Sequence, residues 1–208
     1  EKNPLGGAEW IKFHGLLFGK ETEAAASYCD TAARYECNSI AGSNMKPGQL
    51  KKPTVLFTSA TSPAWGGGYN ILMTPYKNRI VNDAGAVYPD LSAYDTPCST
   101  PVAFPCRTQH ASHGYTTGFS FPAAYNATFH AALALADLII DETYPGGQTL
   151  STITTKYGLD GAATLPAAFA AGKAYTLDGT MNAGGGTDWF ESRIAEPDAL
   201  LQVRVGAR

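Results

Sequence analysis

The fold is decided by residues 52–85, which read KPTVLFTSATSPAWGGGYNILMTPYKNRIVNDAG. Thr54 to Thr58 is a short apolar and β-branched run, which predicts a buried strand. Residues 59–68 end in three glycines and predict a loop. Residues 69–84 carry apolar side chains at helical spacing, and Gly85 follows them, so we expect a helix that ends there. A strand, a glycine-rich loop and a helix are the opening of a doubly wound α/β unit.

Further along the chain, predicted strands and helices continue to alternate. Residues 88–120 are rich in Pro, Ser and Thr and predict an irregular segment. The elements expected after it are a helix over 121–136, a strand over 137–141, short helical pieces over 150–157 and 165–171, a strand over 173–177, and helices around 188–194 and from 197 onwards. This alternation, without any internal repeat, favours the α/β class with a parallel sheet.

On the amino-terminal side of this unit, residues 4–36 predict one long helix. Trp10, Phe13 and Leu17 begin a series of apolar residues at three- and four-residue spacing. Asn3 can cap the start, and Pro4 suits the first turn. Glycines in the middle weaken the helix, so we expect a bend near residues 19–20, and residues 38–53 predict a polar connector.

Composition limits the classes of function. The chain has 208 residues, of which 44% are hydrophobic and 16% charged, with a net charge of -3 and a pI near 5.8. A globular protein is therefore expected, and a nucleic-acid partner is not, because such a partner requires a basic surface. The longest apolar stretch, residues 129–140, is interrupted by His130 and Asp137 and is too short to span a membrane. The first residues lack a signal-peptide pattern, which fits either a mature secreted protein or part of a longer chain.

The four cysteines form two close pairs, Cys29 with Cys37 and Cys98 with Cys106. Neither spacing is that of a zinc ribbon, so we expect two local disulfides and an oxidising compartment. The alternative is four reduced thiols in a cytosolic protein. Asn126-Ala127-Thr128 is a glycosylation sequon, which also indicates secretion.

The order of elements, together with certain phrases, resembles the cluster-III solute-binding proteins of ABC importers, which bind siderophores, haem, cobalamin or metal ions. The phrases are, in chain order, Ala8-Glu9-Trp10-Ile11-Lys12-Phe13, Ala33-Arg34-Tyr35, Lys52-Pro53-Thr54-Val55-Leu56, Ile80-Val81-Asn82-Asp83-Ala84-Gly85, Ala136-Asp137-Leu138-Ile139-Ile140, Leu165-Pro166-Ala167, Gly172-Lys173-Ala174-Tyr175, Asp188-Trp189-Phe190 and Glu196-Pro197-Asp198. The cysteines and the sequon would also fit a eukaryotic secreted relative, such as an algal surface protein.

The resemblance implies an architecture. In that family two α/β lobes flank a rigid helix, and the ligand lies between the lobes. Residues 1–51 would then be the connecting helix and its linker, and residues 52–208 the carboxyl-terminal lobe, a three-layer Rossmann-like unit. Residues 92–118 would be an insertion. The amino-terminal lobe is missing from this alignment, so either the chain is part of a longer precursor, or the lobe comes from elsewhere, such as a separate chain. The other implied partners are the ligand itself and a membrane permease, and no resident cofactor is expected.

The loop after the first predicted strand supplies the first candidate ligand-binding residues. Trp65 precedes the glycines and could stack on a corrin or porphyrin ring, or it could fold back onto the core. Gly67 and Gly68 could present backbone N–H groups to an anion at the start of the next helix, with Tyr69 beside them. No P-loop lysine follows, so the glycines alone do not indicate a phosphate site.

A second candidate lies at residues 109–115. His110, His113 and Tyr115 fall within six residues and could bind a transition metal through imidazole nitrogens and a phenolate. Solvated surface histidines are the alternative. His14 and His130 lie in predicted helices and are expected to be structural.

Enzymes and surface proteins remain as rival classes. Residues 118–122 lack the second glycine of a nucleophile elbow. Asp137, Asp141 and Glu142 could form a carboxylate pair for a secreted hydrolase, but no nucleophile–base pair or cofactor motif accompanies them. We therefore expect a binding protein that is not an enzyme, with a structural or adhesive surface protein as the alternative. Asp83, Glu142 and Glu196 are candidate exposed acids for contact with a permease.

Overall fold

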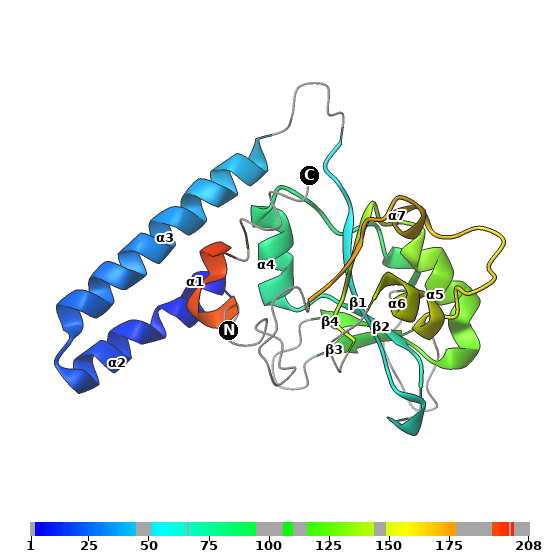
Figure 1. Ribbon diagram of the computed structural model, residues 1–208, viewed down its shortest axis with the longest axis horizontal. Helices are drawn as coiled ribbons and strands as arrows, with labels where there is room; N and C mark the ends of the chain where they lie inside the picture. The colour runs from blue at the N-terminus through cyan, green and yellow to red at the C-terminus, as the bar shows by residue number, and fades with distance from the viewer. Residues whose placement is uncertain are drawn as a thin grey trace.

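The computed structural model describes residues 3–44, 51–65, 67–94, 106–109, 116–143, 149–177, 193–199 and 201. A pair of helices extends from one side of a unit in which helices cover a twisted sheet (Figure 1). The α/β class that the sequence predicts is confirmed.

The amino-terminal region is a helical hairpin, so the prediction of one helix over residues 4–36 is wrong. A short helix α1 (Pro4–Ala8) is followed by α2 (Trp10–Phe18) and α3 (Glu21–Ser43), and α2 and α3 lie side by side (Figure 1). Gly19 ends α2 in the left-handed conformation, with φ 63°, which glycine adopts at little cost. The expected bend is therefore a reversal of the chain.

Gly15 sets how closely the two helices approach. A Cβ atom at this position would lie 2.4 Å from the Cβ of Ala24. Only glycine leaves room for α3 at this point of α2. Gly15, one of the glycines expected to weaken a single helix, is thus a contact between two helices.

The sheet has six strands in the order β3-β4-β2-β1-β5-β6. The strands are β1 (Val55–Ala60), β2 (Tyr69–Leu72), β3 (Cys106–Gln109), β4 (Thr116–Phe121), β5 (Leu138–Asp141) and β6 (Ala174–Thr176). β1, β5 and β6 run parallel, whereas β2 and β4 are antiparallel to their neighbours. The prediction of a parallel sheet therefore holds for one half of this mixed sheet.

The helix predicted over residues 69–84 begins later than expected. Residues 69–72 alternate between buried and half-buried positions, as a strand does, and pair with β1 as a hairpin. The helix α4 (Pro75–Asp83) starts only after Thr74, whose side chain accepts a hydrogen bond from Lys77 N. The glycine-rich loop, with the short 3-10 turn η1 (Pro63–Trp65), thus joins two strands and does not precede a helix.

The segment between α4 and β5 is also more regular than expected. It contains the turn η2 (Ser92–Tyr94), the strands β3 and β4, and the turn η3 (Ala123–Tyr125). The helix predicted over 121–136 is α5 (Asn126–Leu133), because β4 continues to Phe121. The predictions of β1, β5, β6, α6 (Leu150–Lys156) and α7 (Ala167–Ala170) are confirmed to within a few residues.

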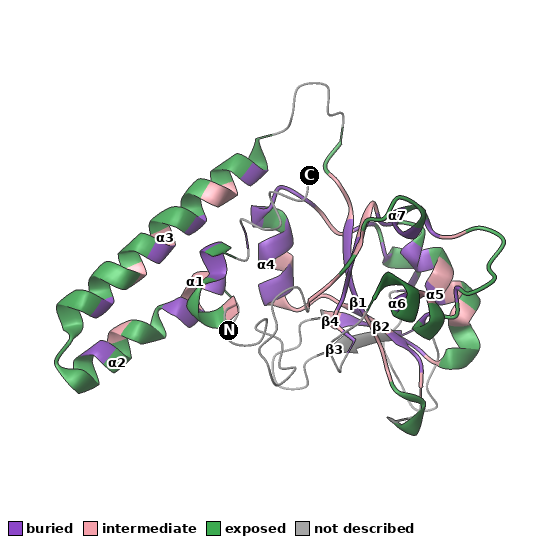
Figure 2. Cartoon of the chain, viewed as in Figure 1, coloured by how far each residue is buried: buried purple, intermediate pink, exposed green. Residues whose placement is uncertain are grey.

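Helices cover both faces of the sheet, which makes three layers (Figure 2). On one face Leu56 and Ile139 contribute to a core that includes α5, α6 and α7. On the other face Val55, Phe57 and Ile140 pack with Val81 of α4. Successive residues of β1 and β5 point to opposite faces, so a continuous apolar run fits a strand that is buried on both sides.

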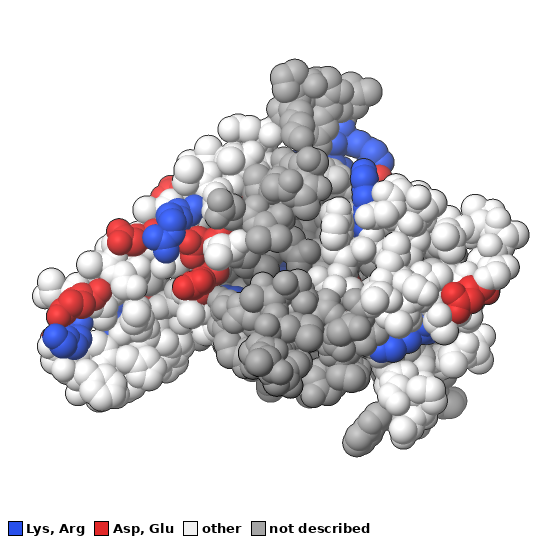
Figure 3. Space-filling model, in the orientation of Figure 1, with Lys and Arg blue, Asp and Glu red and all other residues white. Residues whose placement is uncertain are grey.

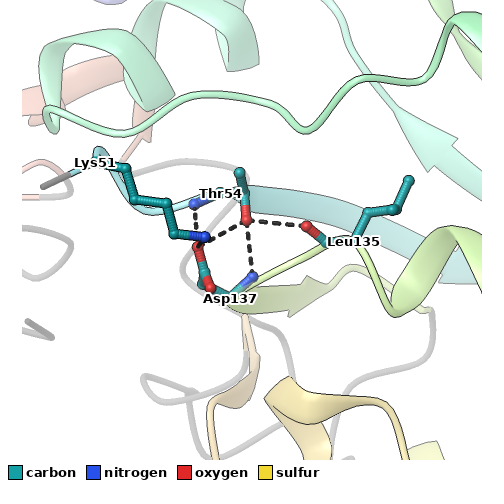
Figure 4. Close-up of polar contacts among 4 residues, drawn as sticks. All are labelled: Lys51, Thr54, Leu135 and Asp137. Carbon is teal, nitrogen blue, oxygen red and sulfur yellow. Dashed lines mark hydrogen bonds and ion pairs between the residues drawn. The ribbon is translucent and has the colours of Figure 1, made fainter.

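The amino ends of β1 and β5 are joined by a polar network (Figure 4). The backbone N–H of Thr54 donates to Asp137 Oδ2 at 2.8 Å, and the backbone N–H of Asp137 donates to Thr54 Oγ1 at 3.0 Å. Lys51 Nζ lies 3.7 Å from the same carboxylate oxygen. Burial raises the pKa of Asp137, but the hydrogen bonds from Thr54 and the charges of Lys51 and Lys173 together outweigh burial and lower it. The network fixes the register of the parallel pair.

The helix α3 is attached to the α/β unit near its carboxyl-terminal end. Tyr35 Oη donates to Asp83 Oδ2 at 2.7 Å, and Arg34 Nε lies 2.6 Å from Asp198 Oδ2. Asp83 also accepts from Arg79 and is only 8% exposed, so the expectation that it is an exposed acid is wrong. α1 and α3 both contact α4, so the hairpin does not stand apart from the rest, and the division of the chain at residue 51 stays a prediction.

Candidate functional site

Polar side chains gather where the parallel strands β1 and β5 end. Thr58 and Asp141 are paired in register, and both are buried. In open α/β sheets, ligands bind beyond the carboxyl ends of the strands. We call the group formed by Thr58, Lys77, Asp141, Glu142, Thr143 and Tyr157 the carboxyl-edge cluster.

On the α6 side of this edge, Asp141 is held by three hydrogen bonds. Tyr157 Oη donates to Asp141 Oδ1 at 2.5 Å, and Thr143 Oγ1 donates to the same oxygen at 2.6 Å. The backbone N–H of Thr143 lies 3.2 Å from Oδ2. Thr143 Oγ1 in turn accepts from Ala60 N at 2.8 Å, and Tyr157 Oη lies 2.7 Å from Thr58 Oγ1. The network therefore ties the end of β5 to the end of β1 and to α6.

Burial dominates the ionisation of this network. It raises the pKa of Asp141, and the hydrogen bonds from Thr143 and Tyr157 only partly offset it. Burial, followed by the charge of Asp141, raises the pKa of Tyr157 well above its ordinary value. The phenol thus keeps its proton, which it needs in order to donate to the carboxylate.

On the α4 side of the same edge, Glu142 pairs with Lys77. The two charges lie 2.9 Å apart, and their side chains are 11% and 8% exposed. Lys77 Nζ also lies 5.6 Å from the centroid of the Phe57 ring. Glu142 Oε1 has no hydrogen-bond partner among the described residues. Because the Glu142 side chain is only 11% exposed and is paired with Lys77, the expectation that it is an exposed acid is wrong; of the three candidates, Glu196 alone is exposed.

The arrangement does not support the carboxylate pair of a hydrolase. Asp137 lies at the opposite end of β5, and Asp141 and Glu142 contact helices on opposite faces of the sheet. Within the described residues, no group of three or more His, Cys, Asp or Glu could hold a metal ion. The cluster is instead a set of paired side chains that holds two strand ends in place, and within it Glu142 Oε1 is the atom without a partner among the described residues.

The glycines of the glycine-rich loop are required by the conformation of the loop's own backbone. Gly67 and Gly68 have φ of 65° and 112°, and Gly67 N–H donates to Ser62 O within the loop at 3.1 Å. A Cβ at Gly68 would lie 2.6 Å from Phe121 O. A strand follows the loop, so the expectation that these glycines stand at a helix start is wrong and no helix dipole is added, while anion binding by Gly67 and Gly68 stays a prediction.

Tyr69 belongs to the core. Its ring is 9% exposed and stacks on Phe129, with the ring centroids 4.4 Å apart and the planes 4° from parallel. β2 directs this ring beneath α5, which leaves little of its surface for a ligand, and a ligand contact by Tyr69 stays a prediction. The backbone of Trp65 lies in η1, but its side chain is outside the described part, so stacking by Trp65 stays a prediction.

The candidate metal ligands His110, His113 and Tyr115 lie outside the described residues and stay predictions. His130, expected to be structural, has Nε2 2.6 Å from Tyr157 O at the end of α6. His14 is exposed on α2.

The first cysteine pair does not form a disulfide. Cys29 and Cys37 are free, exposed thiols on α3. Eight residues of helix separate them by about 12 Å, whereas a disulfide needs Cα atoms within about 7 Å. Cys106 is buried at the start of β3 and is disulfide-bonded, but Cys98 lies outside the described residues, so their pairing stays a prediction.

The glycosylation sequon is half-buried. Asn126 is the first residue of α5, and its Nδ2 is packed against Gly158, where a Cβ would lie 2.6 Å from it. Nδ2 is the atom that a glycan would occupy, so this contact disfavours a glycan in the folded chain.

Sequence reasoning missed Lys77, Thr143 and Tyr157. Lys77 lies within the apolar pattern of α4, and its partner is 65 positions away, so no local signal marks it. The Asp-x-Thr spacing of Asp141 and Thr143, directly after an apolar run, was the one available sign that the strand end is polar and structured.

No family model and no curated protein sequence matches this chain. Solved structures do match it in fold. A possible iron-binding periplasmic solute-binding protein from Staphylococcus epidermidis aligns over 97% of this chain and 60% of its own, with 14% identity and a TM-score of 0.56. The periplasmic heme-binding protein BhuT aligns over 97% and 63%, with 13% identity and a TM-score of 0.54. The siderophore periplasmic binding protein from the fuscachelin gene cluster of Thermobifida fusca aligns over 94% and 58%, with 17% identity and a TM-score of 0.50.

This chain spans about three fifths of the length of each of these neighbours. The alignments include both the helical hairpin and the sheet, since they cover nearly all of this chain. The resemblance read from the sequence is thus matched by the coordinates: the chain has the fold of part of a periplasmic solute-binding protein.

Proposed function

We propose that this chain is one lobe and the connecting helices of a solute-binding protein that captures a metal ion or a metal chelate for an ABC importer. The observation that carries the proposal is the fold, which is shared over nearly the whole chain with proteins named for binding iron, heme and a siderophore. These neighbours are binding proteins, which agrees with the expectation that this chain is not an enzyme.

The carboxyl-edge cluster supports the proposal by making a rigid edge. Asp141 and Glu142 fix the ends of β1 and β5 through contacts with α6 and α4. The loop that carries Trp65 leaves this edge directly from β1. A ligand contact mounted on fixed strand ends binds without much loss of conformational freedom. Iron-siderophore, haem, cobalamin and a free metal ion are the candidate ligands.

The proposed location is outside the cytoplasm, in the periplasm or at the cell surface. No described helix combines the length and the apolar character that crossing a bilayer requires. The second partner would be a membrane permease, for which the exposed Glu196 is the remaining candidate contact of the three acids.

Titration of the purified chain tests the proposal. Haem, cobalamin, ferrichrome and Fe³⁺ are added separately and followed by absorbance and calorimetry. We expect saturable binding of one of them, weakened at least tenfold by Trp65→Ala or by the pair His110→Ala and His113→Ala. The matched control is His14→Ala, which changes an exposed histidine on α2.

Two results would count against the proposal. No binding of any probe by a chain with normal circular dichroism would favour a structural or adhesive surface protein with this fold. If a probe binds and none of the substitutions weakens it, the proposed contact residues are wrong, although the assignment of the chain as one lobe still stands.

A further inference from the structure

The outward side of α3 carries two free thiols. On the inward side, Ala24 meets α2, and Tyr35 and Gly42 meet α4. Ala33 is nine residues from both Ala24 and Gly42, about two and a half turns, so it points the opposite way, and it is exposed. Buried positions recur along a helix that is otherwise mostly exposed (Figure 2). The α3 outer face is defined here as the exposed residues Ala26, Cys29, Ala33, Cys37 and Ile40.

The two cysteines are placed symmetrically on the α3 outer face. Cys29 precedes Ala33 by four residues, and Cys37 follows it by four. The two thiols therefore lie about 40° to either side of Ala33 and about 6 Å before and after it along the helix axis. A second copy of α3 can lie antiparallel to the first, with a two-fold axis at Ala33. Cys29 of each copy is then level with Cys37 of the other copy.

A bond between two copies suits these thiols, whereas a bond within one chain does not. Within α3, Cys29 and Cys37 are about 12 Å apart, and the Cα atoms of a disulfide lie within about 7 Å of each other. Across the antiparallel pair, the Cα atoms come to about 5–7 Å when the helix axes are about 8–10 Å apart. The small side chain of Ala33, at the centre of the face, leaves room for this approach.

The charges of α3 oppose this pairing until the bonds form. Acidic side chains recur along the hairpin (Figure 3). α3 contains four acidic residues and a single basic one, Arg34, which is paired with Asp198. Asp30 and Glu36 are exposed at the rim of the α3 outer face, where two copies would bring like charges together. We therefore expect the reduced chain to be a monomer and the pairing to depend on the disulfides.

We propose that the α3 outer face pairs with the same face of a second copy of this chain, through two disulfides that join Cys29 of each copy to Cys37 of the other. Each bond forms by exchange with a small disulfide such as oxidised glutathione. A thiolate of one copy displaces one glutathione thiol, and the thiolate of the other copy then displaces the second. Two protein thiols thus lose two electrons and two protons, and one oxidant disulfide becomes two thiols.

Mixing two single-cysteine variants tests the pairing. Cys29→Ser keeps Cys37, and Cys37→Ser keeps Cys29. Neither variant can form the proposed bond with itself, because like thiols lie about 12 Å or more apart across the two-fold axis. The two full chains, one with an affinity tag, are treated with oxidised glutathione alone and as an equimolar mixture. We expect the mixture to form a disulfide-linked heterodimer at least tenfold faster than either variant forms a homodimer, as measured by non-reducing electrophoresis and intact mass.

A substitution at Ala33 tests the surface without changing a thiol. Ala33→Glu brings two carboxylates together at the two-fold axis and should slow dimer formation by the wild-type cysteines at least tenfold. Ala25→Glu is the matched control, because Ala25 is exposed on the same helix but lies about 80° from Ala33 around the axis. In high salt, which screens the other charges, it should change the rate less than threefold. Both variants should keep the circular dichroism and melting temperature of the wild type.

Three outcomes overturn the inference. Homodimers of the single variants that form as fast as the heterodimer would mean that the exposed thiols react by random collision. A wild-type chain that stays monomeric with the oxidant would mean that the two faces do not meet. Equal rates for Ala33→Glu and the wild type would mean that the copies join in another arrangement. The proposed function does not enter these measurements, because no ligand is added.

Discussion

Replacing Tyr157 by Phe removes one hydroxyl from the buried network at the carboxyl edge. That hydroxyl donates to Asp141 Oδ1 at 2.5 Å, and the two side chains are 0% and 2% exposed, so water does not replace it in the folded chain. A hydrogen bond to a charged group contributes about 1.5–3 kcal/mol. Asp141 keeps its two bonds from Thr143, so we expect a loss near the middle of that range, about 2 kcal/mol.

The loss should depend on pH in a defined direction. The folded pKa of Asp141 is raised by burial, so its proton is held more tightly in the folded chain than in the unfolded one. The resulting contribution to stability is present at low pH and is lost as the pH rises through the folded pKa. Since the bond from Tyr157 lowers this pKa, the Phe variant raises it further. The variant should therefore be most destabilised at neutral pH and approach the wild type in acid, where a protonated Asp141 needs one donor fewer.

Thermal unfolding followed by circular dichroism between pH 4 and pH 8 measures this effect. A loss of about 2 kcal/mol corresponds to a fall in Tm of about 4–8 °C for a chain of this size. Tyr175→Phe, on the partly exposed strand β6, is the matched control and should leave Tm nearly unchanged. An equal fall in Tm at every pH, or no fall at neutral pH, would refute the conclusion that the Tyr157 hydroxyl donates to a charged Asp141 carboxylate.

Three further predictions concern the ion pair, the hairpin and the thiols. Lys77→Met leaves the Glu142 carboxylate buried without its partner and should cost about 3–5 kcal/mol in urea unfolding, whereas adding Glu142→Leu should recover most of it; additive losses would show that the pair is not coupled. Gly15→Val places a side chain into α3 and should cost about 1–3 kcal/mol with a loss of helical signal, and an unchanged far-ultraviolet spectrum would contradict the close approach. Cys29 and Cys37 should react with two equivalents of a thiol reagent on the native, unreduced chain, and no reaction would mean that they are paired after all.

The parts of the fold that the sequence predicted correctly are those fixed by local pattern. β1, β5 and β6 are short apolar runs, and such a run predicts a strand whatever its position in the sheet. β2 was missed because Ile71 and Leu72 precede Tyr76 at a spacing that fits a helix as well as a strand. Pro75 decides between the two, since it starts the helix after the strand has ended.

Long-range contacts account for the remaining differences. The apolar spacing continues across Gly19, so a single helix and a hairpin have the same pattern, and only the left-handed glycine reverses the chain. The burial of Asp83 by Tyr35 and of Glu142 by Lys77 joins residues 48 and 65 positions apart. From the sequence alone, Asp83 and Glu142 are therefore expected to be exposed acids, because partners so far away along the chain cannot be recognised.

The position of β1 between an antiparallel and a parallel neighbour affects how the sheet assembles. Residues 61–68 alone separate β1 from β2, so this hairpin can close within microseconds. Pairing with β5 must instead bring together Thr54 and Asp137, 83 positions apart. Until then the second edge of β1 is apolar and unpaired, which is the kind of edge that joins other chains. Substitutions in α5 or β5 that slow this step would reduce the yield of folded chain while leaving the folded structure unchanged.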